Sequence, residues 1–125
     1  MISHIDHLVL TVRSLEETCN FYERTLGFQR KNVAGKPTSL TFGSCKLSIH
    51  EAGHTFEPKA SIPTPGSADF CLIAAVPMED VLERLRSSGV TIELGPVKRS
   101  GAKGEMMSVY FRDPDRNLVE VSRYL

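Results

Sequence analysis

The stretch HLVLTVRSLEETCNFYERTLG, residues 7–27, contains a strand pattern followed by a helix pattern. Branched and small residues alternate up to Val12, which indicates a strand over residues 2–12. Ser14 and Glu17 have the spacing of a capping box, so a helix is expected to begin there, and Gly27 supplies the left-handed residue that ends it. The expected helix has one apolar face, formed by residues three or four positions apart: Leu15, Cys19, Tyr22 and Leu26.

The patterns that follow this stretch continue to the end of the chain. Three strands are expected at residues 28–33, 37–43 and 46–51, separated by glycine-containing turns. Residues 52–66 contain three prolines and two glycines and are expected to form a linker or surface loop. Beyond it we expect a strand at residues 67–76, a helix between Pro77 and Gly89, and strands at 91–98, 105–112 and 118–124. Residues 113–117, Asp-Pro-Asp-Arg-Asn, have the composition of a turn.

This order of elements is an internal repeat. The spacing from His7 to Gly27 equals the spacing from Asp69 to Gly89. Aligning the two halves matches His7 with Asp69 and Ser48 with Glu120. Two copies of a strand–helix–three-strand unit, each with one apolar sheet face, pack most simply into one mixed α+β domain. We therefore predict a single domain over residues 1–125, with a first module at 1–51, the linker at 52–66 and a second module at 67–125.

The composition excludes several classes of protein. Lys plus Arg and Asp plus Glu are both 15, so the net charge is zero and the chain lacks the basic character of a non-specific nucleic-acid binder. No apolar run approaches the ~20 residues of a membrane span, and the first residues do not resemble a secretory leader. Three cysteines with no Cys-x-x-Cys pair argue against a disulfide framework. We expect a cytoplasmic protein with reduced thiols.

Three titratable residues stand out in strands expected to be at least half buried: His7, Asp69 and Glu120. Taken singly, two of them have a structural interpretation: Glu120 is paired to an arginine or lies at a sheet edge, and His7 is a satisfied core histidine. The repeat favours a shared role, because alternation of side chains allows all three to face one cavity. Imidazole and carboxylate donors suit one divalent ion such as Mn²⁺, Fe²⁺, Ni²⁺, Co²⁺ or Zn²⁺. Three protein ligands also leave coordination positions open for a substrate.

Other polar residues are candidates for substrate contact or proton transfer. His50 and Ser48 lie two positions apart on one strand and so share a face, which makes His50 a candidate fourth ligand, general base or rim histidine. Residues 96–104, PVKRSGAKG, combine three basic residues with two glycines. We expect them to form either a mobile loop that closes over an anionic substrate, with Arg99 and Lys103 as counter-charges, or an ordinary solvated hairpin loop.

Three fragments resemble the vicinal oxygen chelate superfamily, also called the glyoxalase, bleomycin-resistance and extradiol-dioxygenase superfamily. They are residues 5–12 (IDHLVLTV), the helix end from Phe21-Tyr22 to Leu26-Gly27-Phe28, and residues 111–120 (FRDPDRNLVE), the most specific of the three. Residues 56–60 and 65–73 resemble the lactoylglutathione-lyase-like, glyoxalase-domain-containing subgroup in particular.

The resemblance implies paired βαβββ modules that form a cup-shaped mixed sheet around a metal. His7 matches the first-strand ligand and Glu120 the last-strand ligand. The chain departs from the commoner pattern at two positions, with Asp69 where histidine is usual and Ser48 where glyoxalase I has Glu or Gln. Dimers are common in the superfamily, so a homodimer of twofold symmetry is expected.

Two classes of function follow from the resemblance. The first is a metal-dependent lyase or isomerase that acts on a small substrate with vicinal oxygens, such as a glutathione adduct, through an enediolate-type intermediate, with Glu120 or His50 as the base. An extradiol-type dioxygenase is a variant of this class. The second is a non-catalytic protein of the same fold that sequesters a small molecule. Stoichiometric binding of a divalent ion separates the two.

Overall fold

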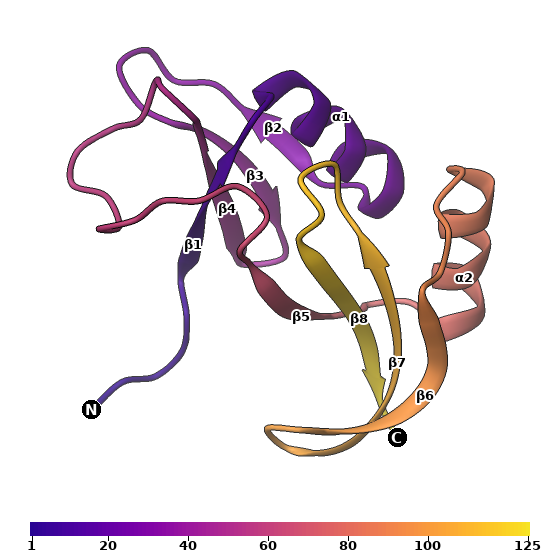
Figure 1. The fold of residues 1–125 in the computed structure, drawn as a ribbon. Helices are drawn as coiled ribbons and strands as arrows, with labels where there is room; N and C mark the ends of the chain where they lie inside the picture. The colour runs from indigo at the N-terminus through magenta and orange to yellow at the C-terminus, as the bar shows by residue number, and fades with distance from the viewer. The chain divides into compact units, whose positions relative to one another are not determined.

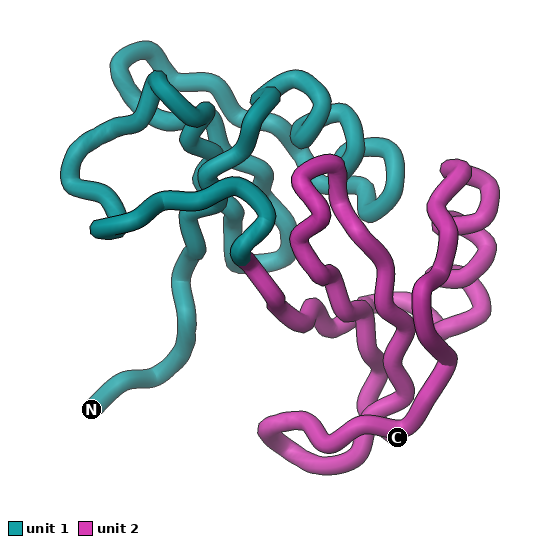
Figure 2. The backbone as a smooth tube through the Cα atoms, viewed as in Figure 1, with its two compact units in different colours: residues 1–67 teal, residues 68–125 magenta.

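Two four-stranded mixed sheets, each accompanied by one helix, make up the fold, as the ribbon in Figure 1 shows. The computed structural model describes all residues, 1–125. The chain forms two compact units, Met1–Ser67 and Ala68–Leu125 (Figure 2). The α+β class and the paired strand–helix–three-strand modules predicted from the sequence are confirmed.

The two units have the same topology. The first consists of β1 (His7–Val12), α1 (Leu15–Leu26), β2 (Gln29–Lys31), β3 (Thr38–Phe42) and β4 (Cys45–Glu51). The second consists of β5 (Asp69–Ile73), α2 (Met78–Ser87), β6 (Leu94–Gly101), β7 (Gly104–Arg112) and β8 (Leu118–Tyr124). The sheet orders are β1-β4-β3-β2 and β5-β8-β7-β6, and in each the first strand runs parallel to the last.

The strand register supports the alignment of the two halves. In the first unit Val9, two positions after His7, is the Cα partner of Ser48. In the second unit the residue two positions after Asp69 is the Cα partner of Glu120. Ser48 and Glu120 therefore occupy equivalent places in the two sheets.

Local signals set the limits of the first helix as the sequence predicts. The Ser14 side chain accepts a hydrogen bond from the backbone N–H of Glu17, and Gly27 ends the helix at φ 72°. Cys19 and Tyr22 are fully buried on its inner face. The Tyr22 ring stacks on Phe28, which in turn stacks on Phe42 at 4.3 Å between centroids. These contacts fasten α1 to the sheet of its own unit.

The structure shortens some expected strands and lengthens others. The first strand begins at His7 and not at residue 2, because its ladder with β4 starts at the pair His7–Lys46. Of the two alternatives for residues 96–104, the hairpin is found and the mobile loop is wrong: most of the segment is paired strand, with Arg99 of β6 opposite Met106 of β7. Backbone pairing with β7 orders this basic segment, so it cannot act as a long mobile loop. Neither α1 nor α2 has the length and apolar character needed to cross a membrane.

Candidate functional site

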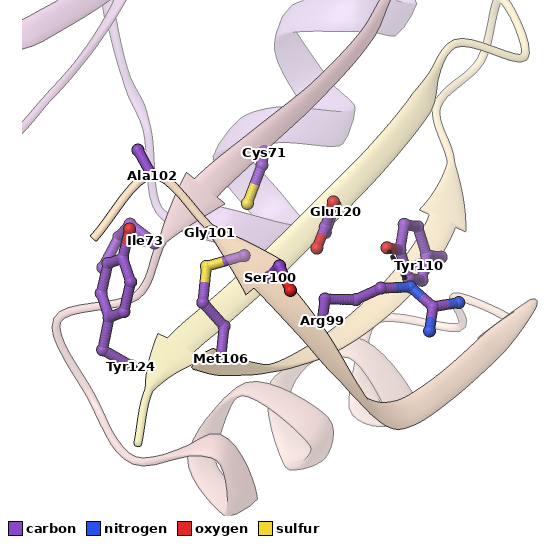
Figure 3. Close-up of a pocket in the computed structure, with 10 residues that line it drawn as sticks. All are labelled: Cys71, Ile73, Arg99, Ser100, Gly101, Ala102, Met106, Tyr110, Glu120 and Tyr124. Carbon is purple, nitrogen blue, oxygen red and sulfur yellow. Dashed lines mark hydrogen bonds between the residues drawn. The ribbon is translucent and has the colours of Figure 1, made fainter. Parts of the chain in front are cut away.

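A pocket of about 460 Å³ lies on the second unit (Figure 3). It is formed where side chains of β5, β6, β7 and β8 face the same side of the sheet. The opposite faces of β7 and β8 carry the fully or nearly fully buried Val109, Phe111, Val119 and Val121. The residues that line the pocket are Cys71, Ile73, Arg99, Ser100, Gly101, Ala102, Met106, Tyr110, Glu120 and Tyr124.

Glu120 is the carboxylate of this pocket. It lies on β8 between its Cα partners Cys71 of β5 and Tyr110 of β7, and Figure 3 shows all three side chains in the pocket. Its Oε2 atom accepts a hydrogen bond of 3.2 Å from the Ser122 hydroxyl. The two central strands of the sheet thus hold a half-buried acid in a defined orientation.

Arg99 lies beside this acid, held by the neighbouring tyrosine. Its Nε–H donates to the Tyr110 hydroxyl at 3.0 Å, and the guanidinium carbon lies 5.5 Å from the centre of the Tyr110 ring. The Nη1–H group of Arg99 donates a second hydrogen bond to the Lys98 carbonyl at 3.0 Å. Because both acceptors are uncharged oxygens, the positive charge of Arg99 remains available to an anionic ligand.

The pocket raises the pKa of two of its acids. Burial raises the pKa of the Cys71 thiol; a hydrogen bond to Ser122 opposes this, and the Glu120 carboxylate adds to it. Burial also raises the pKa of the Tyr110 hydroxyl, with Arg99 opposing and Glu120 adding. Both groups therefore keep their protons at neutral pH and can act as hydrogen-bond donors.

Asp69 lies on the same sheet face as Glu120, one side-chain position further along. Its Cα partner is Leu118, and the residue is exposed. Its charge acts on Arg112, whose pKa is raised chiefly by two hydrogen bonds to Glu93 and also by Asp69. The second unit thus brings two of the three predicted ligands to one face.

His7, the third predicted ligand, belongs to the first unit and lies at the start of β1. Its Nδ1 atom lies 2.8 Å from Asp6 Oδ1, and in the tautomer that donates this bond Nε2 carries the lone pair that can bind a metal. Neither unit by itself contains a group of three or more His, Cys, Asp or Glu side chains placed to hold a metal. The set His7, Asp69 and Glu120 draws on both units and stays a prediction.

The donor chemistry of these residues nevertheless fits a divalent ion. The Asp6–His7 pair is the carboxylate–histidine arrangement that orients ligating imidazoles in metalloproteins. One carboxylate oxygen of Glu120 accepts the bond from Ser122, and the carboxylate also interacts with the Tyr110 hydroxyl and the Cys71 thiol. One imidazole and two carboxylates suit Mn²⁺, Fe²⁺, Co²⁺, Ni²⁺ or Zn²⁺.

The two polar candidates of the first unit, Ser48 and His50, are buried in its sheet. Both lie on β4, with 7% and 4% of their surfaces exposed. The His50 ring packs against Phe56 of the linker at 5.6 Å, and its Nδ1 atom has no hydrogen-bond partner. Their predicted roles in substrate binding and proton transfer remain untested.

Lys103 occupies the tip of the hairpin between β6 and β7. Its backbone N–H donates to the Tyr124 hydroxyl at 3.2 Å, and its side chain is not among those that line the pocket. Gly101 allows the hairpin to lie against the Tyr124 hydroxyl, because a Cβ at position 101 would be only 2.8 Å from that oxygen. Of the two predicted counter-charges, Arg99 lines the pocket and Lys103 does not.

Sequence reasoning missed the groups that surround Glu120. Tyr110, Cys71 and Ser122 are its neighbours across and along the sheet. Their position follows from the register between three strands, which a single sequence does not contain. The only available signal was the alternation along β8 that places Ser122 on the same face as Glu120.

Comparison with known proteins defines the class. Residues 4–121 match the model of the Glyoxalase/Bleomycin resistance protein/Dioxygenase superfamily, and the chain belongs to this superfamily. It is 49% identical to the virulence protein STM3117 of Salmonella typhimurium, over the whole chain and 87% of that protein. The crystal structure of STM3117 superposes with a TM-score of 0.97, covering 100% of this chain and 99% of that one.

Two further relatives carry more descriptive names. The glyoxalase domain-containing protein RDO1 of Mycosarcoma maydis is 42% identical over 98% of this chain and 69% of its own length. The fosfomycin resistance protein FosX of Listeria innocua is 31% identical over 97% of this chain and 90% of its own length. These similarities establish the family resemblance seen in the sequence.

Proposed function

We propose that the protein is a metal-dependent, glyoxalase-like enzyme of lyase or isomerase type that acts on a small substrate with two neighbouring oxygens. The observation that carries the proposal is Glu120, a half-buried carboxylate fixed by Ser122 in a pocket that also presents Arg99. Superfamily membership supports it. His7, Asp69 and Glu120 would hold the metal, which supplies Lewis-acid stabilisation of negative charge on the substrate oxygens.

The residues of the pocket have distinct roles in this proposal. Glu120 would act as the base and take the proton of the substrate carbon onto the oxygen that is not bonded to Ser122, while His7 and Asp69 would keep hold of the metal; loss of this proton leaves an enediolate. Arg99, held by Tyr110, binds an anionic group on the substrate, such as a carboxylate of a glutathione adduct. His50 is the second candidate base; its burial against Phe56 makes Glu120 the stronger one.

Metal content is the direct test of this proposal. Protein washed with chelator and resupplied with Mn²⁺, Fe²⁺, Co²⁺, Ni²⁺ or Zn²⁺ is expected to retain one ion per chain. The double variant His7→Ala, Glu120→Ala should lose it, whereas the matched control His54→Ala, Glu105→Ala removes an exposed histidine and an exposed glutamate and should keep it. No binding by the wild type would refute the metalloenzyme.

Turnover tests the role of the acid. Once a substrate is found by screening vicinal-oxygen compounds, Glu120→Gln should lower kcat about 100-fold or more, because general-base catalysis contributes at least this much. Glu105→Gln should leave kcat unchanged. Equal turnover by Glu120→Gln and the wild type would remove Glu120 from the mechanism.

A second function, sequestration of a small molecule without chemistry, is favoured by the apolar part of the same pocket. Ile73, Met106 and the ring of Tyr124 form one side of it, a surface suited to an amphipathic ligand. The name of the relative FosX, a fosfomycin resistance protein, is compatible with antibiotic handling by either route. Ligand-dependent thermal stabilisation of metal-free protein would support this alternative.

The proposal includes a homodimer. β1 and β5 are edge strands of their own sheets and expose apolar side chains, with Val9 49% and Ile73 54% accessible. Exposed apolar edges favour association with another chain. Light scattering is expected to give twice the 13.9 kDa chain mass, and a monomer would exclude a site shared between copies. The proposal also retains a cytoplasmic location, in which Cys19, Cys45 and Cys71 stay reduced.

A further inference from the structure

A hydrogen-bond network lies beside Glu120 in the second unit, on the same face of the sheet. Ser108 of β7 and Ser122 of β8 are Cα partners, and both are completely buried. Their hydroxyl oxygens are 2.6 Å apart. The Ser122 oxygen also lies 3.2 Å from Glu120 Oε2 and 3.2 Å from the Cys71 sulfur. Ser122 is therefore the centre of a network with three partners.

The number of available protons determines the direction of each hydrogen bond. A serine hydroxyl has one proton to donate and two lone pairs that accept, whereas a carboxylate only accepts. The Ser122 proton is therefore directed to Glu120, and the Ser122 oxygen accepts from the Ser108 hydroxyl. The Cys71 sulfur lies 3.2 Å from the same oxygen, and its thiol has a second acceptor in the Leu72 carbonyl at 3.9 Å. Rotation of the Ser122 hydroxyl would therefore break its hydrogen bond to Glu120.

We infer that Ser122 is a positioning residue for Glu120. Its hydroxyl fixes Oε2, so that the second carboxylate oxygen is presented to the pocket in one orientation. Ser108 on β7 and Cys71 on β5 flank that hydroxyl from the two neighbouring strands. The inference rests on the proposed function, because it concerns how Glu120 is prepared to bind a metal and to accept a proton.

If the two serines only fill space in the sheet, their substitution should have a different effect on metal binding. Small hydroxyl side chains at 0% exposure can occupy a tight layer of a sheet for reasons of size alone. In that case a substitution of similar size would change stability but not the properties of Glu120. A positioning role instead requires that metal binding respond to loss of the hydroxyl and recover when a hydroxyl is restored.

The test is Co²⁺ binding followed by the visible absorption of the ion. Ser122→Ala is expected to weaken Co²⁺ binding 10- to 100-fold, as removal of an outer hydrogen-bond partner of a ligand typically does. It should also alter the Co²⁺ absorption bands, because the carboxylate is free to rotate. Ser122→Thr, which restores the hydroxyl, should bind within about threefold of the wild type. Ser39→Ala, a buried serine on β3 of the first unit, is the matched control and should leave binding unchanged.

The possible outcomes separate this inference from the proposed function. Co²⁺ binding that is abolished in Glu120→Gln but has wild-type affinity and bands in Ser122→Ala would overturn the positioning role alone. Absence of Co²⁺ binding by the wild type would overturn both. If Ser122→Ala folds poorly by circular dichroism, Ser108→Ala removes the partner that holds the Ser122 hydroxyl and should weaken binding in the same direction; unchanged binding there would also refute the inference.

Discussion

Asn117 connects the turn before β8 to the strand that carries Asp69, and its removal is expected to destabilise the second unit. The side chain is 1% exposed. Its Nδ2 donates to Asp113 Oδ2 at 2.8 Å, and its Oδ1 accepts from the backbone N–H of Ala68, also at 2.8 Å. Asp113 in turn accepts from the backbone N–H groups of Asp115 and Asn117.

The cost of Asn117→Ala can be worked out from these bonds. A hydrogen bond to a charged group contributes about 1.5–3 kcal/mol and a neutral one about 1 kcal/mol, so the loss should be about 3 kcal/mol. For a chain of this size the melting temperature should fall by roughly 10 °C. Because Ala68 immediately precedes Asp69, the substitution should also weaken metal binding by the proposed site.

Urea unfolding followed by circular dichroism measures this loss, since the chain contains no tryptophan to report by fluorescence. Asn117→Asp keeps an acceptor for Ala68 but places a second carboxylate against Asp113, so it should be destabilised as well. Gln29→Ala, which removes an exposed amide side chain on β2, should change stability by no more than about 0.5 kcal/mol. A loss below about 1 kcal/mol in Asn117→Ala would refute the assignment of these bonds as a structural link.

Two further predictions concern single residues of the second unit. Arg116 is the only non-glycine residue with positive φ, at 72°. Arg116→Gly should stabilise the protein by about 0.5–1 kcal/mol, because the relief of left-handed strain exceeds the cost of the added entropy of the unfolded chain. The urea midpoint should therefore rise, and an unchanged or lower midpoint would contradict the prediction. The raised pKa of the Cys71 thiol means that less thiolate is present at pH 8 than in a free cysteine, so metal-free protein should react slowly with iodoacetamide at this site. Glu120→Gln removes one cause of the raised pKa and should accelerate the reaction, as measured by peptide mass spectrometry; a slower reaction would contradict the assigned sign.

Much of the fold was predictable because its signals are local. The cap at Ser14, the left-handed Gly27 and the turn at residues 113–117 each depend on residues a few positions apart. The internal repeat matched Ser48 with Glu120, and the strand registers agree with this alignment. The site was predictable in part for the same reason: equal spacing in the two halves pointed to Asp69 and Glu120, which do share a face of one sheet.

Pairing between distant segments decided the rest. Residues 96–104 have the composition of a loop, yet hydrogen bonds to β7 make most of them strand and place Arg99 beside Tyr110. No local preference encodes that contact, because it arises from the register of two strands.

The sequence by itself determined the strand–helix–three-strand repeat, the class of fold and the acid at the centre of the pocket, since periodicity and capping act over a few residues. Only the tertiary structure decided which groups surround that acid. Cys71, Tyr110 and Ser122 come from three strands, and their hydrogen bonds and charges depend on a register set by the packing of the whole sheet.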